Sequence, residues 1–393
     1  MVAVSAPDPR VAPLLTAGQV PQVRLRGSVL LRQGGAVSVP LVSAQRKSSM
    51  GYIHRHELQA VIPDLSKVEA RDLEQRRAWD ALDLNGGHSL RVAVEITAGR
   101  ETVRAPQGVY WITRAPRGAG GAWLVTGKSH EELVRQANLL ADIKAEGSAL
   151  EFLARRIQAA VPGAQLEWGD EDITDVRLTA TLLRADAGGA SNVLKASQQD
   201  SAWAAIRSIE RACGWRVGCD LEGRWQVTLP RAVSGPPDWV IARGATMTSF
   251  QGSQSLDEVC NVAVVVSTDE RWTGVAVDDR PGSPTYPGPD VVAAAPFAAD
   301  RGVNAQPGFW PVFARRVVMD GIGSTAQAMQ AARGELTGRR SSVKAGSTWQ
   351  PWADVEDRVL IRSGVETPRL AVLTDVTVDL GVSSGGMDLE VRE

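Results

Sequence analysis

The feature that most constrains this chain is the alternation of apolar and polar residues in short runs separated by glycine-rich turns. It is clearest in VRLRGSVLLRQGGAVSVPLVSA, residues 23–44, where two alternating runs flank Gly34 and Gly35. Such alternation indicates strands with one buried face, and the glycine pair is typical of a hairpin. Similar runs follow at 51–63, 90–99, 109–115 and 122–127. We therefore predict a closed or nearly closed antiparallel barrel over residues 20–130, after an N-terminal arm at 1–19.

Residues 131–245 change to a helical pattern. Ser148 and Glu151 form an S-x-x-E capping box before an apolar stripe that stops at Pro162. A second stripe ends at Gly214, and two short alternating runs follow around a Glu-Gly turn at 222–223. The members of this second stripe are Trp203, Ile206, Ile209 and Cys213. Strands so close in sequence pair antiparallel, which predicts a helix-plus-hairpin α+β domain.

Residues 246–393 return to strands. The pattern predicts a hairpin at 261–279, a helix at 324–337 opened by an S-x-x-Q box, and a closing hairpin at 369–393. The predicted fold class is therefore mainly β with an α+β insertion, in which two β-barrel-like modules flank a helix-plus-hairpin domain.

Charge and composition exclude several classes of function. The 393 residues carry a formal net charge of -2, so no overall basic field favours nucleic acid, and we expect no sequence-specific nucleic-acid partner. Asp8 and Pro9 interrupt the apolar core that a signal peptide needs, and no apolar run is long enough to cross a bilayer. We expect a soluble chain made in the cytosol without a membrane partner. Its three cysteines lack C-x-x-C spacing, which favours free thiols.

Two stretches offer weak signals for a nucleotide or a metal. Gly127-Lys128-Ser129 ends like a phosphate-binding loop, but the glycine required four residues earlier is replaced by Ala122. His54 and His56 share one face of a strand and could ligate a metal with a carboxylate from elsewhere. An exposed polar strand face is the interpretation we favour for this pair.

Other catalytic patterns are missing from the sequence. The acidic run at 167–175 lacks the central glycine and the distal glutamate of a calcium loop, and no Gly-rich dinucleotide fingerprint occurs. We therefore expect no enzymatic activity and no cofactor. The twelve tryptophans are spread over all modules, which favours core and interface anchors over a base-stacking platform.

Asp278 and Asp279 precede a proline-rich stretch and could suggest paired catalytic carboxylates. Adjacent residues of an extended strand point to opposite faces, so the two side chains cannot converge on one substrate. We predict that these residues end a strand.

The segment that follows, 280–311, holds seven of the 21 prolines. Proline fixes φ and removes a hydrogen-bond donor, so we predict neither helix nor central strand here. A long segment of this kind serves function or is disordered, and its aromatic residues suit contact with another chain. The predicted interaction anchors are Tyr286, Phe297, Phe309 and Trp310.

The ordered set of motifs carries a resemblance. The helix and hairpin at 200–230, the run from Asn261 to Pro284 and the late helix at 324–340 resemble the minor tail proteins of siphophages that infect actinobacteria. These proteins are similar in turn to the tail-tip or baseplate hub proteins of tailed phages. The resemblance covers about residues 145–365 by motif and the rest by the order of elements.

The resemblance implies a structural hub that closes the distal end of the tail tube as a homotrimer. The implied partners are the distal tail protein, the tape measure protein and receptor-binding or central fibre proteins, and the implied location is the virion tail tip, assembled in the host cytoplasm. No lysozyme or peptidase domain follows the last hairpin, so cell-wall degradation is not expected. A host-surface hydrolase or carbohydrate-binding tail module is the alternative, suggested by the scattered tryptophans and acidic loops.

Overall fold

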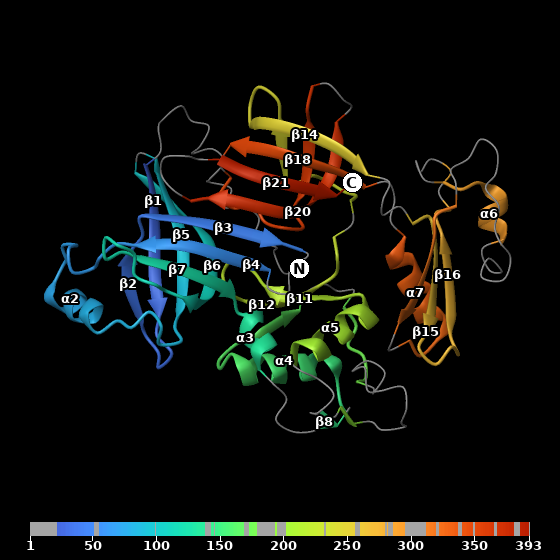
Figure 1. Cartoon of the computed structure of the whole chain (residues 1–393), viewed down its shortest axis with the longest axis horizontal. Coiled ribbons are helices and arrows are strands. Elements are labelled where there is room, and N and C mark those ends of the chain that lie inside the picture. The colour runs from blue at the N-terminus through green and yellow to red at the C-terminus, as the bar shows by residue number, and fades with distance from the viewer. Residues whose placement is uncertain are drawn as a thin grey trace.

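The computed structural model places a large sheet above a helical domain, with a small three-stranded domain beside them (Figure 1). The described residues are 22–50, 55–98, 100–137, 143–144, 146–168, 173–178, 193–194, 202–231, 233–255, 260–279, 281, 286–294, 312–319, 322–336, 340–348, 350–364, 368–380 and 386–392.

Seven antiparallel strands form the N-terminal half of the large sheet. β1, Gln22–Leu30, pairs with β2, Ala36–Pro40, in the predicted hairpin, and Gly34 and Gly35 both take positive φ in its turn. The remaining strands are β3 (Ser43–Ser49), β4 (His56–Ile62), β5 (Ser89–Ala98), β6 (Glu101–Arg114) and β7 (Trp123–Ser129).

A short helix protects the outer edge of this half. α2, Leu73–Asp80, begins at Asp72, whose side chain accepts a hydrogen bond from the Gln75 amide. Trp79 of α2 donates its indole N–H to the Ser38 carbonyl of edge strand β2 at 2.8 Å. An edge strand whose carbonyl is already bonded is a poorer template for unwanted pairing.

Six strands from the C-terminal half extend the same sheet. They are β13 (Trp239–Ala242), β14 (Met247–Ser255), β18 (Arg340–Thr348), β19 (Arg358–Arg362), β20 (Arg369–Asp379) and β21 (Gly386–Arg392). The order is β14-β18-β21-β20-β3-β4-β7-β6-β5-β1-β2, and β19 pairs with β20 and β13. β3 and β20 join the halves, with Lys47 opposite Thr377. One apolar core runs under both halves, from Leu58 and Tyr110 to Val376 and Leu389.

The helical domain has its own core. Helices α3 (Glu131–Gln136), α4 (Ala149–Ala160) and α5 (Ala202–Cys213) cover a sheet in which β11 (Arg216–Cys219) pairs with β12 (Trp225–Thr228), and β12 pairs in parallel with β9 (Leu166–Trp168). A two-stranded pair joins β8 (Ile143–Lys144) to β10 (Val193–Leu194). Ser148 caps α4 as predicted, accepting a hydrogen bond from the Glu151 amide. The α+β insertion of the predicted fold class is confirmed.

The small domain lies on the right of Figure 1, beside α5 of the helical domain. β15 (Val262–Ser267) lies between β16 (Thr273–Val277) and β17 (Ala314–Met319), and α7 (Thr325–Glu335) packs on β15 and β16. α7 approaches β16 closely at Gly274, where an added Cβ would lie 2.1 Å from the Ala328 carbonyl carbon. The predicted Ser324 cap accepts a hydrogen bond from the Gln327 amide.

Two predicted boundaries differ from the strand topology. The sequence pattern predicts that residues 131–245, which include β13, belong to the helical domain. In the structure, β13 pairs in parallel with β19 of the large sheet. The elements β15, β16, β17 and α7, which we predict as part of the second β-rich module, form a separate small domain instead. Alternation within a strand reports which face is buried and not which distant strand lies beside it, so the sequence pattern could not resolve either point.

The proline-rich segment also departs from its prediction. A helix, α6 (Pro289–Ala294), forms where none was expected. Proline is tolerated at the first helical position because its missing N–H would have no partner in the helix. Gly288, just before the helix, takes φ 108°, and Val291 of α6 is 1% exposed.

Candidate functional site

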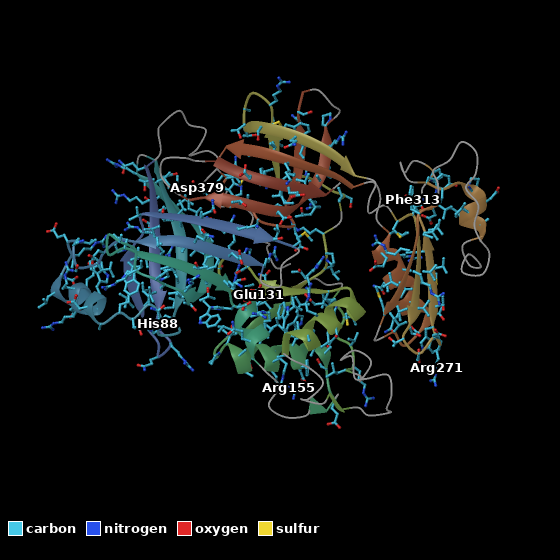
Figure 2. The ribbon with its side chains drawn as sticks, in the orientation of Figure 1. His88, Glu131, Arg155, Arg271, Phe313 and Asp379 are labelled. Carbon is cyan, nitrogen blue, oxygen red and sulfur yellow. The ribbon has the colours of Figure 1, made fainter. Side chains whose placement is uncertain are left out.

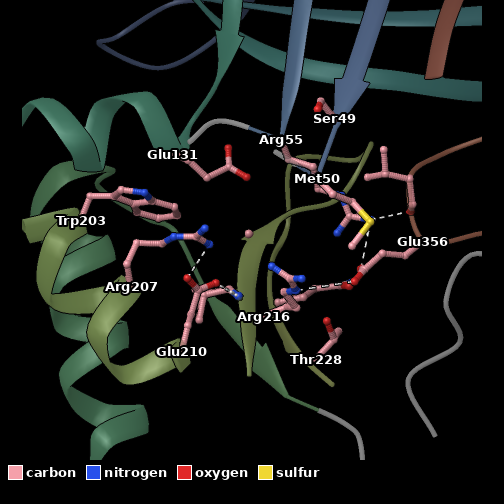
Figure 3. A pocket seen from close by; sticks show the side chains of 14 residues that line it. Ser49, Met50, Arg55, Glu131, Trp203, Arg207, Glu210, Arg216, Thr228 and Glu356 are labelled. Atoms are coloured by element: carbon pink, nitrogen blue, oxygen red, sulfur yellow. Dashed lines mark hydrogen bonds and ion pairs between the residues drawn. The ribbon is translucent and has the colours of Figure 1, made fainter. Parts of the chain in front are cut away.

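Three parts of the chain meet at a buried charged cluster beneath the large sheet. We call Arg46, Arg55, His56, Glu131, Asp354 and Glu356 the junction cluster. It borders a cavity of about 60 Å³ between the sheet and the helical domain (Figure 3). A cavity that accepts a small-molecule ligand measures roughly 300–1,000 Å³, so this space suits a few water molecules at most.

The segment between β18 and β19, residues 350–357, docks onto the N-terminal half of the sheet through its backbone. Arg46 donates to the Ala353 carbonyl, and Arg55 donates to the Val355 carbonyl at 2.9 Å. Gln107 donates to the Pro351 carbonyl at 2.5 Å. Arg46 and Gln107 are 0% exposed, so their bonds are shielded from water. We call 350–357 the docking segment.

A bulge in β6 aims Gln107 at the docking segment. The register of β5 with β6 shifts between Val92 and Ala93, opposite Gly108 and Pro106, which leaves Gln107 as the extra residue. Bulges of this kind redirect a side chain out of the regular alternation. Gly108 has φ 130°, and a Cβ there would lie 2.4 Å from the Tyr110 ring. The bulge therefore depends on glycine at this position.

Carboxylates of the docking segment compensate the charges of the arginines that face it. Arg55 Nη2 lies 3.6 Å from Asp354 Oδ2 and 3.7 Å from Glu356 Oε2, and Arg216 Nε lies 3.9 Å from Glu356 Oε1. Burial tends to raise the pKa of Asp354, but His56 in its protonated form and the permanent charges of Arg55 and Arg46 outweigh burial and hold that pKa below its usual value. For Arg55, burial tends to lower the pKa, but the surrounding carboxylates have the larger effect, so the pKa of Arg55 is raised.

The backbone of the docking segment is constrained at Glu356. This residue takes φ 71°, a left-handed conformation that costs a residue with a side chain about 1–3 kcal/mol. Its amide donates to the Leu373 carbonyl at 2.8 Å, so pairing with β20 holds the conformation in place.

His56 is neutral and fixed in one tautomer. Burial lowers its pKa to about 4, against the attraction of Asp354. Nε2 lies 3.2 Å from the Cys219 carbonyl, which can only accept, so this nitrogen carries the proton. Nδ1 then accepts from the Ser48 hydroxyl at 2.8 Å. His56 thus links β3 and β4 to β11 of the helical domain.

This arrangement cannot activate a serine. In a Ser-His-Asp triad the serine and the aspartate contact different ring nitrogens. Here Ser48 and Asp354 both face Nδ1 of His56, Asp354 at 3.6 Å, while Nε2 is occupied by a carbonyl. Ser48 and His56 are also buried, at 0% and 1% exposure.

Two buried glutamates fix the hairpin of the helical domain. Glu131 accepts from the Cys219 amide at 2.7 Å, and burial raises its pKa. Glu210 of α5 accepts from the Val217 amide at 2.7 Å and pairs with Arg207, while burial raises its pKa as well. Figure 3 shows both glutamates on the helical side of the cavity. Both carboxylates bind backbone amides of β11, a structural role.

The metal interpretation finds no support in the part of the chain that is described. No group of three potential ligands occurs there. His54 lies outside the described residues. The exposed polar face that we favoured for this pair is wrong for His56, which is 1% exposed, because the docking segment and β11 cover that part of β4. Ser129 of the rejected phosphate-loop motif lies in β7 and accepts from the His56 amide.

The strand end predicted at Asp278 and Asp279 is confirmed. β16 ends at Val277, and the Asp278 amide donates to the Asn261 carbonyl at 2.9 Å. Asp278 is 5% exposed, whereas Asp279 is exposed, so the two carboxylates do not converge.

Of the four predicted interaction anchors, the structure describes one. Tyr286 is half-buried before α6, and Phe297, Phe309 and Trp310 lie outside the described residues. Of the junction cluster, sequence reasoning singled out only His56. A signal for the cluster was present in β3, where Arg46 falls on the inward face between Ala44 and Ser48.

Acid should test the role of His56. Its pKa of about 4 lies below the unfolded value of 6.5, so the unfolded chain binds more protons between these pH values and stability falls as pH drops through this window. The shift corresponds to about 3 kcal/mol. We expect His56→Gln to reduce the loss of unfolding free energy measured by urea titration from pH 6.5 to pH 4.

The variant must be compared with wild type because Asp357 has the opposite effect on the pH dependence of stability. Burial raises the pKa of Asp357 to about 7, which weakens the fold as pH rises. His88→Gln, in a turn outside the junction cluster, is the control. An unchanged pH dependence in His56→Gln would show that His56 is not buried as a neutral ring.

The fold is shared over nearly the whole chain with solved tail proteins. The tail protein from Neisseria meningitidis has a TM-score of 0.58 at 13% identity, covering 94% of this chain and 97% of that one. A 43 kDa tail protein of prophage MuSo2 from Shewanella oneidensis has a TM-score of 0.58 at 9% identity, covering 95% and 98%. A prophage tail protein from Listeria monocytogenes has a TM-score of 0.56 at 6% identity, covering 94% of each.

These likenesses show that the chain has the fold of phage tail proteins. No model of a protein family matches the sequence, and no curated protein matches it either. Among the described helices, none is long and apolar enough to cross a membrane.

Proposed function

We propose that this chain is a structural hub of a bacteriophage tail tip. In this role three copies close the distal end of the tail tube and connect the distal tail protein to receptor-binding or central fibre proteins, with the tape measure protein inside. The chain is assembled in the host cytoplasm and acts in the virion without enzymatic activity. The motifs in its sequence favour a siphophage that infects actinobacteria.

One observation supports this role most directly. The two strand-rich halves share a 13-stranded sheet, and the docking segment fixes one half to the other through two buried hydrogen bonds and one half-buried one. A subunit that supplies two strand-rich halves to a closed ring must hold them at a constant angle, because closure depends on the rotation between neighbouring contacts. The fold shared with tail proteins supports the same role.

The proline-rich segment at 280–311 has a place in this proposal. We propose that it packs against a neighbouring subunit or tail protein through Tyr286, Phe297, Phe309 and Trp310. In Figure 1, α6 of this segment lies beside the small domain, away from the junction cluster, and its Val291 is buried.

The proposal predicts a homotrimer. Mass photometry and negative-stain imaging of the purified chain, alone and with its distal tail partner, should show rings of three copies. Limited proteolysis should cut within 280–311 more slowly after assembly. Persistent monomers in both conditions would contradict the hub. Clearing of host cell walls by the purified chain would instead favour the hydrolase alternative.

A further inference from the structure

Charge is segregated along one face of the large sheet. Residues directly opposite one another on neighbouring strands point to the same face of the sheet. Five such residues follow one another from β6 to β20: Trp111, Lys128, Glu57, Lys47 and Thr377. Arg91, opposite Val109 on β6, and Asp388, opposite Thr377, lie on this same face at its two ends. The chain is nearly neutral overall, so a strong local excess of either sign must come from the arrangement of side chains.

The β1, β5 and β6 end of this face is basic. Arg24 and Arg104 lie opposite Glu95 from its two neighbouring strands, and Arg26 pairs with the same carboxylate at 2.7 Å. Arg91 lies further along β5. Arg24, Arg91 and Arg104 are exposed, and none forms an ion pair with a described residue. We call Arg24, Arg26, Arg91 and Arg104 the basic face.

The β20 and β21 end of the face is acidic. Asp375 lies directly opposite Glu390, and Asp388 lies opposite Thr377, with Asp379 two residues further along β20. Like charges directly opposite one another destabilise a strand pair. Lys344 of β18 reaches Glu390 only at 4.0 Å, and its side chain is 66% exposed. We call Asp375, Asp379, Asp388 and Glu390 the acidic face.

We propose that the basic face of one copy binds the acidic face of a second copy of this chain. Each face carries repulsion that a complementary surface would relieve, and such complementarity directs both the encounter and the register of two partners. The two faces are different surfaces on opposite halves of the sheet, so a contact between them is heterologous, and heterologous contacts can close rings. This inference rests on the proposed hub and names the surfaces that join its subunits.

Charge reversal tests the pairing. Arg91→Glu with Arg104→Glu should weaken self-association at least about tenfold, because like charges would then meet, and Asp388→Arg with Glu390→Arg should do the same. A chain carrying all four substitutions should associate again at nearly the wild-type level, because both faces are reversed together. Mass photometry over a concentration series measures this, and circular dichroism checks folding. Raising the salt concentration should weaken wild-type association.

The matched control reverses two arginines outside both faces, Arg155→Glu on the helical domain and Arg271→Glu on the small domain (Figure 2). It should assemble like wild type. A trimer that tolerates either double reversal, or a fourfold variant that does not recover, contradicts the pairing of faces and leaves the ring proposal standing. A wild-type chain that stays monomeric both alone and with its distal tail partner contradicts the ring itself, and this inference with it.

Discussion

Replacing Asp354 with alanine is expected to lower the free energy of unfolding by about 3–5 kcal/mol, because it removes the carboxylate that compensates the buried Arg46 and one of the two that face Arg55. Arg46 is 0% exposed, and Arg55 lies 3.6 Å from the lost carboxylate. Urea titration followed by tryptophan fluorescence measures the effect. Asp354→Asn keeps an acceptor for the Val355 amide and should fall between the alanine variant and wild type.

The matched control is Asp80→Ala, at an exposed position at the end of α2. It should change the unfolding free energy by no more than about 0.5 kcal/mol. We also expect Asp354→Ala to loosen the contact between sheet and helical domain, so that calorimetry resolves two transitions. A single transition with a loss no larger than the control's would mean that the junction cluster does not fix the angle between these parts.

Gly108→Ala should cost about 3 kcal/mol, combining a strained backbone with overpacking of about 1–3 kcal/mol each. Gly108 has φ 130°, and its added Cβ would lie 2.4 Å from the Tyr110 ring. Tyr110 is fully buried, so it has no room to withdraw. The bulge that directs Gln107 toward Pro351 should be disturbed as well.

Gly35→Ala separates the two causes. Gly35 also has positive φ, 87°, but nothing lies within 4 Å of an added Cβ, so only the backbone term of about 1 kcal/mol remains. Thermal and urea unfolding of both variants measure the difference. Equal losses in the two would show that the Tyr110 contact contributes nothing.

Local elements of this protein follow from its sequence. The capping serines at 148 and 324, the turns at Gly34-Gly35 and Gly223, and the strand end at Asp278 all form as predicted. Each depends on interactions within a few residues, such as a side-chain oxygen that binds an amide three positions later or a glycine that accepts positive φ. These interactions are present in the sequence pattern itself.

The junction cluster depended on contacts between distant residues. Arg46 and Ala353 are separated by 307 positions, and His56 and Cys219 by 163. The alternation in β3 indicates that Arg46 points inward. A buried guanidinium is stable only beside a hydrogen-bond acceptor and a carboxylate, and here the docking segment supplies both, the Ala353 carbonyl and Asp354. Residues 51–63 alone show neither that the docking segment packs against this part of the sheet nor that His56 is buried.

The sequence by itself therefore determined the kind of elements and the class of fold, since period, caps and turns act over short distances. Only the tertiary structure decided that β3 pairs with β20 and that β13 joins the large sheet and not the helical domain. It also decided that β15, β16 and β17 form a sheet of their own. The physical reason is that strand pairing uses backbone groups that every residue carries. The choice of partner is made by the packing of whole faces, to which many distant residues contribute together.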